Sequence, residues 1–80
     1  MTLTKLLVVD DEPDIVELLS AGLRYAGFEV AVASGGRQGV ERARSFRPDA
    51  VLLDVMMPDL DGFDVVRKLR GEGNRTPVLF

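Results

Sequence analysis

The chain has 80 residues, of which 46% are hydrophobic and 29% are charged, and its formal net charge at pH 7 is −3. This length and composition predict one small globular domain and exclude a disordered segment. Cysteine and histidine are absent, which excludes disulfides, thiolate metal sites and a histidine general base. The negative charge offers no broad attraction for nucleic acid, and the apolar runs are too short for a membrane span or a signal peptide. We therefore expect a cytoplasmic domain that uses carboxylates, hydroxyls, backbone groups and a hard metal ion.

The first third of the chain alternates short apolar runs with a helical pattern. Residues 6–9 (LLVV) form an unbroken apolar run, which is typical of a strand buried on both faces of a parallel sheet. Residues 13–26 have a proline in the first turn and apolar residues at helical spacing, and Gly27 is placed to end this helix. Residues 28–33 (FEVAVA) predict a second strand, in which Glu29 favours an edge or an end.

A weaker helix is predicted after the turn at residues 34–36. Apolar residues recur at helical spacing up to Phe46, although Gly39 costs such a helix about 1 kcal/mol relative to alanine. Residues 47–49 (RPD) end it.

The remaining elements complete an alternating pattern. Residues 50–53 (AVLL) predict a third strand that ends directly on Asp54. Apolar residues from Phe63 to Leu69 predict a third helix stopped by a nearby glycine, and residues 76–80 (TPVLF) indicate the opening of a fourth strand. Strands that alternate with helices through short connections predict an α/β, doubly wound domain with one parallel sheet.

Two of the predicted strands end in carboxylates, the first on Asp10 and Asp11 and the third on Asp54. In open parallel sheets, ligands bind outside the carboxyl ends of the strands, where the strand order reverses. If the two strands are neighbours, three carboxylates meet in one small volume, where like charges oppose one another. A hard divalent cation resolves this conflict, and an all-oxygen site suits Mg²⁺ best. The simpler interpretation is that Asp10 or Asp11 caps a helix and that nearby acids favour its dipole.

Three strings, VVDDEPD (residues 8–14), LLDVMMPDLDG (residues 52–62) and PVLF (residues 77–80), resemble the receiver domains of two-component response regulators. The similarity is greatest to receivers that precede winged-helix DNA-binding domains. It implies a flavodoxin-like fold with strand order 2-1-3-4-5 in the complete family fold. Residues 1–80 would then be a partial receiver domain, truncated in the fourth strand and without an output domain.

The resemblance also implies a role for each matching residue. Asp54 would be the phosphoacceptor, a sensor histidine kinase would be the donor, and the domain would be a signalling acceptor instead of an enzyme. DNA would be reached only through an output domain absent from this chain, to control transcription. Pro58 and Gly62 would shape the loop between Asp54 and the third helix. The implied Mg²⁺ ligands are Asp10, Asp11, Asp54 and the backbone carbonyl of Met56.

The resemblance is incomplete at the C-terminal end. The family's Ser/Thr on the fourth strand and Lys on the fifth would lie beyond Phe80, so the chain is expected to lack a working phosphorylation switch. One sheet face would lack a covering helix. The side chains of Leu7, Val8, Val51 and Leu52 alternate between the two faces, so those on the uncovered face would stay partly exposed to solvent. We therefore expect a homodimer or another chain to cover that face.

Two other functions stay open. A truncated or degenerate receiver could act only as a protein-interaction module. A metal-dependent hydrolase of the haloacid-dehalogenase type would need Asp-x-Asp after the first strand, whereas this chain has Glu12 at the second acidic position.

Overall fold

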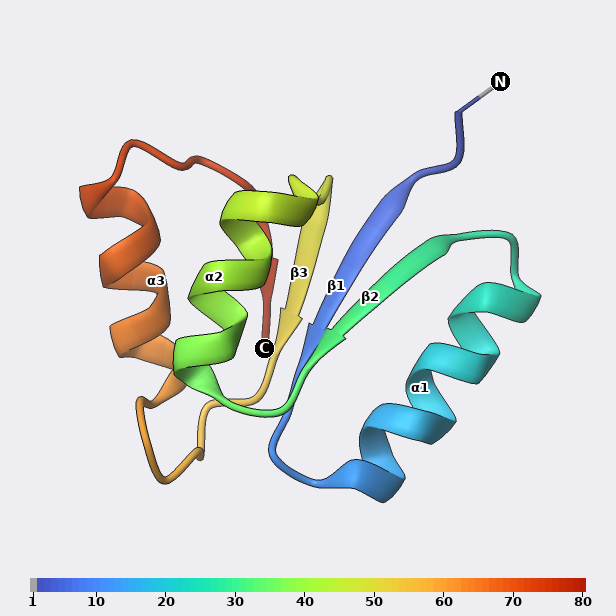
Figure 1. Cartoon of the computed structure of the whole chain (residues 1–80), viewed down its shortest axis with the longest axis horizontal. Coiled ribbons are helices and arrows are strands. Elements are labelled where there is room, and N and C mark those ends of the chain that lie inside the picture. Colours follow the sequence, from blue (N-terminus) through green and yellow to red (C-terminus); the bar gives the residue numbers. More distant parts are fainter. Residues whose placement is uncertain (1) are drawn as a thin grey trace.

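Each apolar run in the sequence forms a strand, and each amphipathic stretch forms a helix. The computed structural model describes residues 2–80, and its four strands form one sheet in the order β2-β1-β3-β4 (Figure 1). All three strand pairs are parallel, so the predicted α/β fold and the 2-1-3-4 part of its strand order are confirmed. The elements are β1 (Lys5–Val9), α1 (Pro13–Tyr25), β2 (Glu29–Ala33), α2 (Gly36–Phe46), β3 (Ala50–Leu53), α3 (Gly62–Gly71) and β4 (Val78–Leu79).

The register of the central strands aligns their carboxyl ends. Val9 of β1 lies opposite Ala33 of β2 on one side and Leu53 of β3 on the other. The pairing continues one step further, because the Asp54 N–H donates to the Val9 carbonyl at 2.9 Å. As a result, the acids that follow β1 and β3 leave the sheet at the same level. Glu29 lies on an edge strand, as its charge indicated.

The helix ends follow backbone sterics. Gly27 follows α1 with a φ of 102°, a left-handed conformation that glycine adopts without a side-chain clash. At the end of α2 the left-handed residue is Arg47, with a φ of 54°. It precedes Pro48, which disfavours the right-handed helical conformation for the residue before it. The RPD segment therefore ends α2 as predicted. No helix within residues 2–80 is long and apolar enough to cross a membrane.

The main core lies between the sheet and the pair α2 and α3. In α3 the buried stripe consists of Val65 and Leu69, four residues apart, whereas Phe63 is 53% exposed. The predicted third helix is therefore confirmed, but Phe63, one of the apolar residues that indicated it, lies outside its buried stripe. Alternate residues of β1 and β3 point into this core. Its buried members are Leu7, Val9, Ala33, Val40, Ala43, Val51, Leu53, Met57, Val65 and Leu69.

Gly39 sets the distance between α2 and the sheet. A Cβ atom at this position would lie 2.8 Å from Cγ1 and 3.0 Å from Cγ2 of Val9. Val9 is a β-branched residue in a central strand and is 1% exposed, so it has little room to move. The glycine that weakens α2 as an isolated helix is thus required for the close packing of α2 on β1.

Gly39→Ala should therefore destabilise the protein despite its better helix propensity. Overpacking costs about 1–3 kcal/mol and the propensity gain is about 1 kcal/mol, so we expect a net loss of about 1 kcal/mol in the free energy of unfolding. Urea denaturation measures this change. Gly22→Ala in α1 is the matched control, because nothing lies within 4 Å of a Cβ there, and it should be neutral or stabilising. A Gly39→Ala variant as stable as the Gly22→Ala variant would contradict this packing account.

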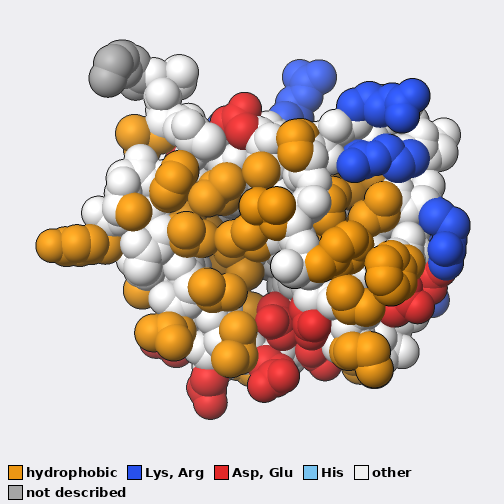
Figure 2. Space-filling model, turned by 180° about the vertical axis from the view of Figure 1, so that it is seen from behind, with side chains coloured by type: hydrophobic (Ala, Val, Ile, Leu, Met, Phe, Trp, Pro, Cys, Tyr) orange, Lys and Arg blue, Asp and Glu red, His pale blue; other side chains and the backbone are white. Residues whose placement is uncertain are grey.

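The opposite face of the sheet is largely uncovered in the described residues. Figure 2 shows hydrophobic side chains spread across this face. A groove of about 310 Å³ on it has a floor that includes Val8 and Leu52 and walls that include Leu19 of α1 and Leu79 of β4. Leu52 is half-buried, as expected for the side chains on the sheet face that lacks a covering helix. The expectation fails for Val8, which is 1% exposed, because α1 packs against β1 and β2.

Candidate functional site

Three carboxylates meet at the carboxyl edge of the sheet. Asp10 and Asp11 follow β1, and Asp54 follows β3; each offers one oxygen, and these oxygens all lie within 4.8 Å of one another. The structure therefore brings together the three acids that the sequence singled out. Two unit charges 4 Å apart repel by about 1 kcal/mol in water and about 4 kcal/mol at the effective dielectric constant of a protein surface. Such a cluster favours a cation.

Two of the three side chains are oriented by their own backbone. The Glu12 N–H donates to Oδ1 of Asp10 at 3.0 Å, and the Met56 N–H donates to Oδ1 of Asp54 at 3.2 Å. In both cases an aspartate bonds the amide two residues later, which is an Asx turn. The simpler interpretation of Asp10 as a helix cap is wrong, because its side chain accepts from the N–H of the N-cap residue Glu12 and not from an amide of the first turn of α1. Glu12, the N-cap residue of α1, has no side-chain capping bond.

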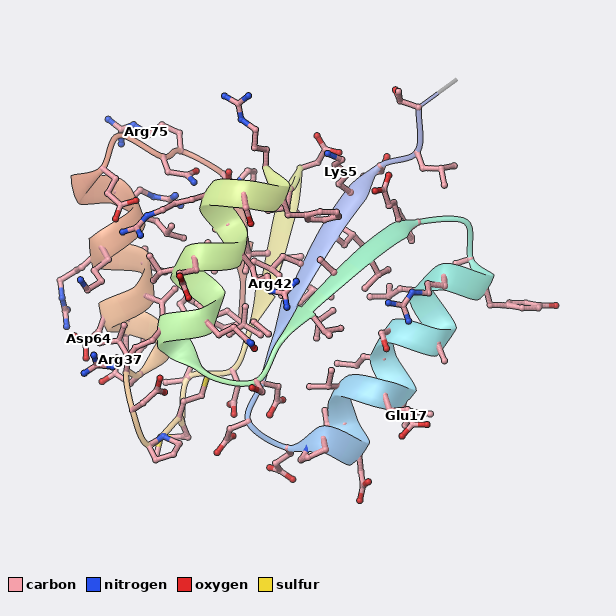
Figure 3. The ribbon with its side chains drawn as sticks, in the orientation of Figure 1. Lys5, Glu17, Arg37, Arg42, Asp64 and Arg75 are labelled. Atoms are coloured by element: carbon pink, nitrogen blue, oxygen red, sulfur yellow. The ribbon has the colours of Figure 1, made fainter. Side chains whose placement is uncertain are left out.

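No cationic side chain of residues 2–80 forms an ion pair with this cluster. The two ion pairs of the described chain join Arg44 to Glu72 and Arg67 to Asp64. The labelled side chain of Lys5 lies toward the opposite end of the sheet, at the start of β1 (Figure 3). Within these residues, no Lys or Arg therefore neutralises the negative charge of the cluster, and the donor set consists of oxygens alone.

The β3–α3 loop places its two methionines in different environments. The Met56 side chain is 80% exposed, whereas Met57 is buried in the core, with Leu60 partly buried against it. This agrees with the prediction that Met57 and Leu60 are packing residues. Gly62 lies against the backbone that directly follows β3, since a Cβ there would be 2.8 Å from the Asp54 carbonyl oxygen. Gly62 thus allows α3 to begin directly beside Asp54.

Two further aspartates in this loop have structural contacts that the sequence analysis missed. Asp61 caps α3 by accepting from the Asp64 N–H at 2.9 Å. An aspartate directly before an amphipathic stretch is a recognisable N-cap signal. Asp59 accepts from Gly36 N–H and Arg37 N–H, both at 3.0 Å. These partners precede it by 23 and 22 residues, so no local pattern indicates the contact.

A family model described as the response regulator receiver domain matches residues 6–80. The chain belongs to this family. Known receivers of this kind are signalling domains, and the curated relatives of this chain are transcriptional regulators. This confirms the family predicted from the motifs around the two acidic strand ends.

The relatives extend well beyond the receiver segment that they share with this chain. The probable transcriptional regulatory protein TcrX of Mycobacterium tuberculosis is 51% identical over 73 residues, which cover 91% of this chain and 31% of that protein. The alkaline phosphatase synthesis transcriptional regulatory protein PhoP of Bacillus subtilis is 44% identical over 75 residues, covering 94% of this chain and 32% of PhoP. The receiver chain thus spans about a third of the length of these relatives.

Solved structures give the same family. Chemotaxis protein CheY4 of Vibrio cholerae matches with a TM-score of 0.91 and 35% identity, covering 96% of this chain and 66% of CheY4. Response regulator TrrA of Thermotoga maritima, solved in complex with Mg(2+)-BeF, matches with a TM-score of 0.87 and 34% identity, covering 95% of this chain and 66% of TrrA. These matches confirm the flavodoxin-like receiver fold.

Proposed function

We propose that this receiver accepts a phosphoryl group on Asp54 beside a Mg²⁺ ion. The observation that carries the proposal is the convergence of three aspartate oxygens within 4.8 Å at the carboxyl edge of the sheet, without an ion pair to any described Lys or Arg. The proposed ligands are the carboxylates of Asp10, Asp11 and Asp54 and the backbone carbonyl of Met56.

The donor set fits Mg²⁺. The chain has no histidine and no cysteine, and carboxylate, carbonyl and water oxygens are the ligands that Mg²⁺ prefers. The structure of TrrA in complex with Mg(2+)-BeF supports this choice of metal. When bound, the metal would supply positive charge beside the transferring phosphoryl oxygens.

The chain's own residues would orient the nucleophile. The Met56 N–H donates a hydrogen bond to Oδ1 of Asp54. Within residues 2–80, no donor bonds to Oδ2 of Asp54. An Asp54 oxygen would attack phosphorus of a phosphohistidine, the P–N bond would break toward the imidazole, and an acyl phosphate would form. Phosphoryl transfer requires mainly positioning and charge stabilisation, so the receiver needs no histidine of its own.

The donor and the output are proposals based on the family. We propose a sensor histidine kinase as donor in the cytoplasm, and a transcriptional output that reaches DNA through a domain outside this chain. The curated relatives support this, because they are transcriptional regulators about three times as long. We also propose that residues 1–80 are a partial receiver domain whose uncovered sheet face is covered by a second copy or another segment.

A small phosphodonor separates this function from its two rivals. The test protein is the 80-residue chain and, in parallel, an extended chain in which residues 1–80 are followed by the C-terminal third of the CheY4 receiver. Phosphoramidate and Mg²⁺ are added, and the intact mass and the released phosphate are measured. A lasting acyl phosphate supports a receiver. Metal binding without phosphorylation of the extended chain indicates an interaction module, and rapid turnover of a phosphomonoester indicates a hydrolase.

Magnesium should raise the stability of the folded chain. Binding to the folded state alone adds about 2.7 kcal/mol when Mg²⁺ exceeds its Kd about a hundredfold. Asp11→Asn should weaken this effect, and it should also raise the melting temperature of the metal-free form because one repelling charge is removed. Thermal melts with and without millimolar Mg²⁺ measure both changes. Identical melts of the wild-type chain at every Mg²⁺ concentration would mean that no metal site is assembled.

A further inference from the structure

Asp59 joins the β3–α3 loop to the first turn of α2. Its two carboxylate oxygens accept hydrogen bonds from successive backbone amides, Oδ1 from Gly36 and Oδ2 from Arg37, each at 3.0 Å. The N-cap residue of α2 is Gly35, which has no side chain to cap the helix. Asp59 therefore caps α2 from another part of the chain. In Figure 1 the β3–α3 loop lies directly below the start of α2.

The contact favours the charged carboxylate. Hydrogen bonds from the backbone of Arg37 and then of Gly36 lower the pKa of Asp59 below its ordinary value. A carboxylate at the N-terminus of an α-helix is also stabilised by the helix dipole. Asp59 is therefore ionised at neutral pH, and both of its oxygens are engaged by the same helical turn.

The loop and the helical turn fit closely. A Cβ at Gly36 would lie 2.3 Å from the carbonyl oxygen of Leu60, and a Cβ at Gly35 would lie 3.2 Å from both carboxylate oxygens of Asp59. The two glycines thus let the β3–α3 loop approach the backbone of α2. Leu60 also packs against the core, where Met57 is buried. Residues 57–60 are consequently fixed by packing at both ends and by the Asp59 bonds between them.

Met56 is fixed by its neighbours and not by its own side chain. That side chain is 80% exposed, and the contact that orients the residue is the bond from its N–H to Asp54. On its C-terminal side it is followed directly by the anchored residues 57–60. The direction of the Met56 peptide therefore depends on Asp54 on one side and on the anchored loop on the other.

We propose that Asp59 is a positioning residue for the acceptor site, because its cap on α2 holds the β3–α3 loop so that the Met56 carbonyl faces the carboxylate cluster. This inference rests on the proposed function, which assigns that carbonyl to the metal. Asp59 does not touch the metal or the phosphoryl group. Its effect is transmitted through residues 57 and 58, and it should appear in metal affinity.

The test compares Mg²⁺ affinity in three variants of the 80-residue chain and of the extended chain. Asp59→Ala should weaken Mg²⁺ binding about tenfold, the lower limit for residues that orient metal ligands. It should also speed amide hydrogen exchange at Gly36 and Arg37 in the metal-free protein. Glu41→Gln is the control for charge, because Glu41 lines the same groove as Asp59 and Asp11, and it should change neither measurement.

A double variant separates positioning from simple stabilisation. Gly35→Ser added to Asp59→Ala supplies a local N-cap, since a serine hydroxyl at that position accepts from the amides of the first turn. Gly35 has a φ of −178°, which serine adopts readily. We expect the double variant to regain the stability of α2 and the slow amide exchange. Its Mg²⁺ affinity should stay about tenfold below that of the wild type, because the residue that orients the metal ligand is still missing.

The outcomes distinguish the two proposals. If Mg²⁺ affinity recovers together with stability in the double variant, or is unchanged in Asp59→Ala, Asp59 is a helix cap only and the positioning role is wrong. If neither wild-type protein binds Mg²⁺, the proposed function fails and the positioning role fails with it. If the wild-type protein binds Mg²⁺, and Mg²⁺ affinity is lowered both in Asp59→Ala and in the double variant, the inference is supported.

Discussion

Replacing Asp54 with asparagine should abolish phosphorylation of the extended chain. The asparagine amide is too weak a nucleophile to attack phosphorus and cannot form an acyl phosphate. The substitution is nearly isosteric, and its amide oxygen can still accept the Met56 N–H that Oδ1 of Asp54 accepts in the wild type. The fold should therefore persist while labelling falls to background. Intact mass after incubation with phosphoramidate and Mg²⁺ measures the effect.

Asp14→Asn is the matched control for this loss. Asp14 is an exposed acid in the first turn of α1, near the same edge of the sheet, and it is not among the three clustered carboxylates. Its removal should leave the extent of phosphorylation unchanged. Labelling that persists in the Asp54→Asn variant would place the acceptor elsewhere and refute the assignment of Asp54.

The second large effect concerns the uncovered face of the sheet. Leu19 of α1 is 41% exposed and Leu79 of β4 is 60% exposed, and both line the groove on this face. Each large apolar side chain left in water forgoes about 1.5–3 kcal/mol of burial, against a total stability of about 5–15 kcal/mol for a typical domain. The β4 edge also leaves backbone groups open to pairing with another chain. The 80-residue chain should consequently be loosely packed or self-associating as a dilute monomer, and well ordered when this face is covered.

Sedimentation and amide NMR spectra test this expectation. The extended chain should be monomeric with dispersed signals, whereas the 80-residue chain should associate. Leu19→Glu together with Leu79→Lys should suppress the association, because both side chains line the groove. Tyr25→Ser should not, although Tyr25 is 95% exposed, because it lies at the C-terminal end of α1 and does not line the groove. A cooperative melt and a dispersed spectrum from the dilute 80-residue monomer would show that this stability argument is wrong.

The sequence predicts the sheet and the acidic cluster because both depend on local patterns. An unbroken apolar run such as LLVV requires cover on both faces, and a parallel arrangement then brings the carboxyl ends of neighbouring strands to one edge. Asp10, Asp11 and Asp54 follow those ends directly. The position of the cluster therefore needs no knowledge of the exact register.

The features that escaped prediction depend on contacts between distant residues. Gly39 appears only as a helix-weakening residue until its distance from Val9 is known. Asp59 carries no local signal of its role, because the α2 amides that bond to it lie more than twenty residues earlier in the chain. Val8 was expected to be as exposed to solvent as Leu52, but its exposure is decided by how α1 packs on β1. Neither apolar periodicity nor motif spacing contains this information.

The position of the phosphoryl group is the most direct test of the account as a whole. The extended chain is incubated with phosphoramidate, with and without Mg²⁺, the acyl phosphate is reduced with borohydride, and the peptides are mapped by mass spectrometry. We expect modification at Asp54 alone, and only when Mg²⁺ is present. Modification of another carboxylate, or equal modification of Asp54 without the metal, would contradict the proposal that the three clustered aspartates form a magnesium-dependent phosphoacceptor site.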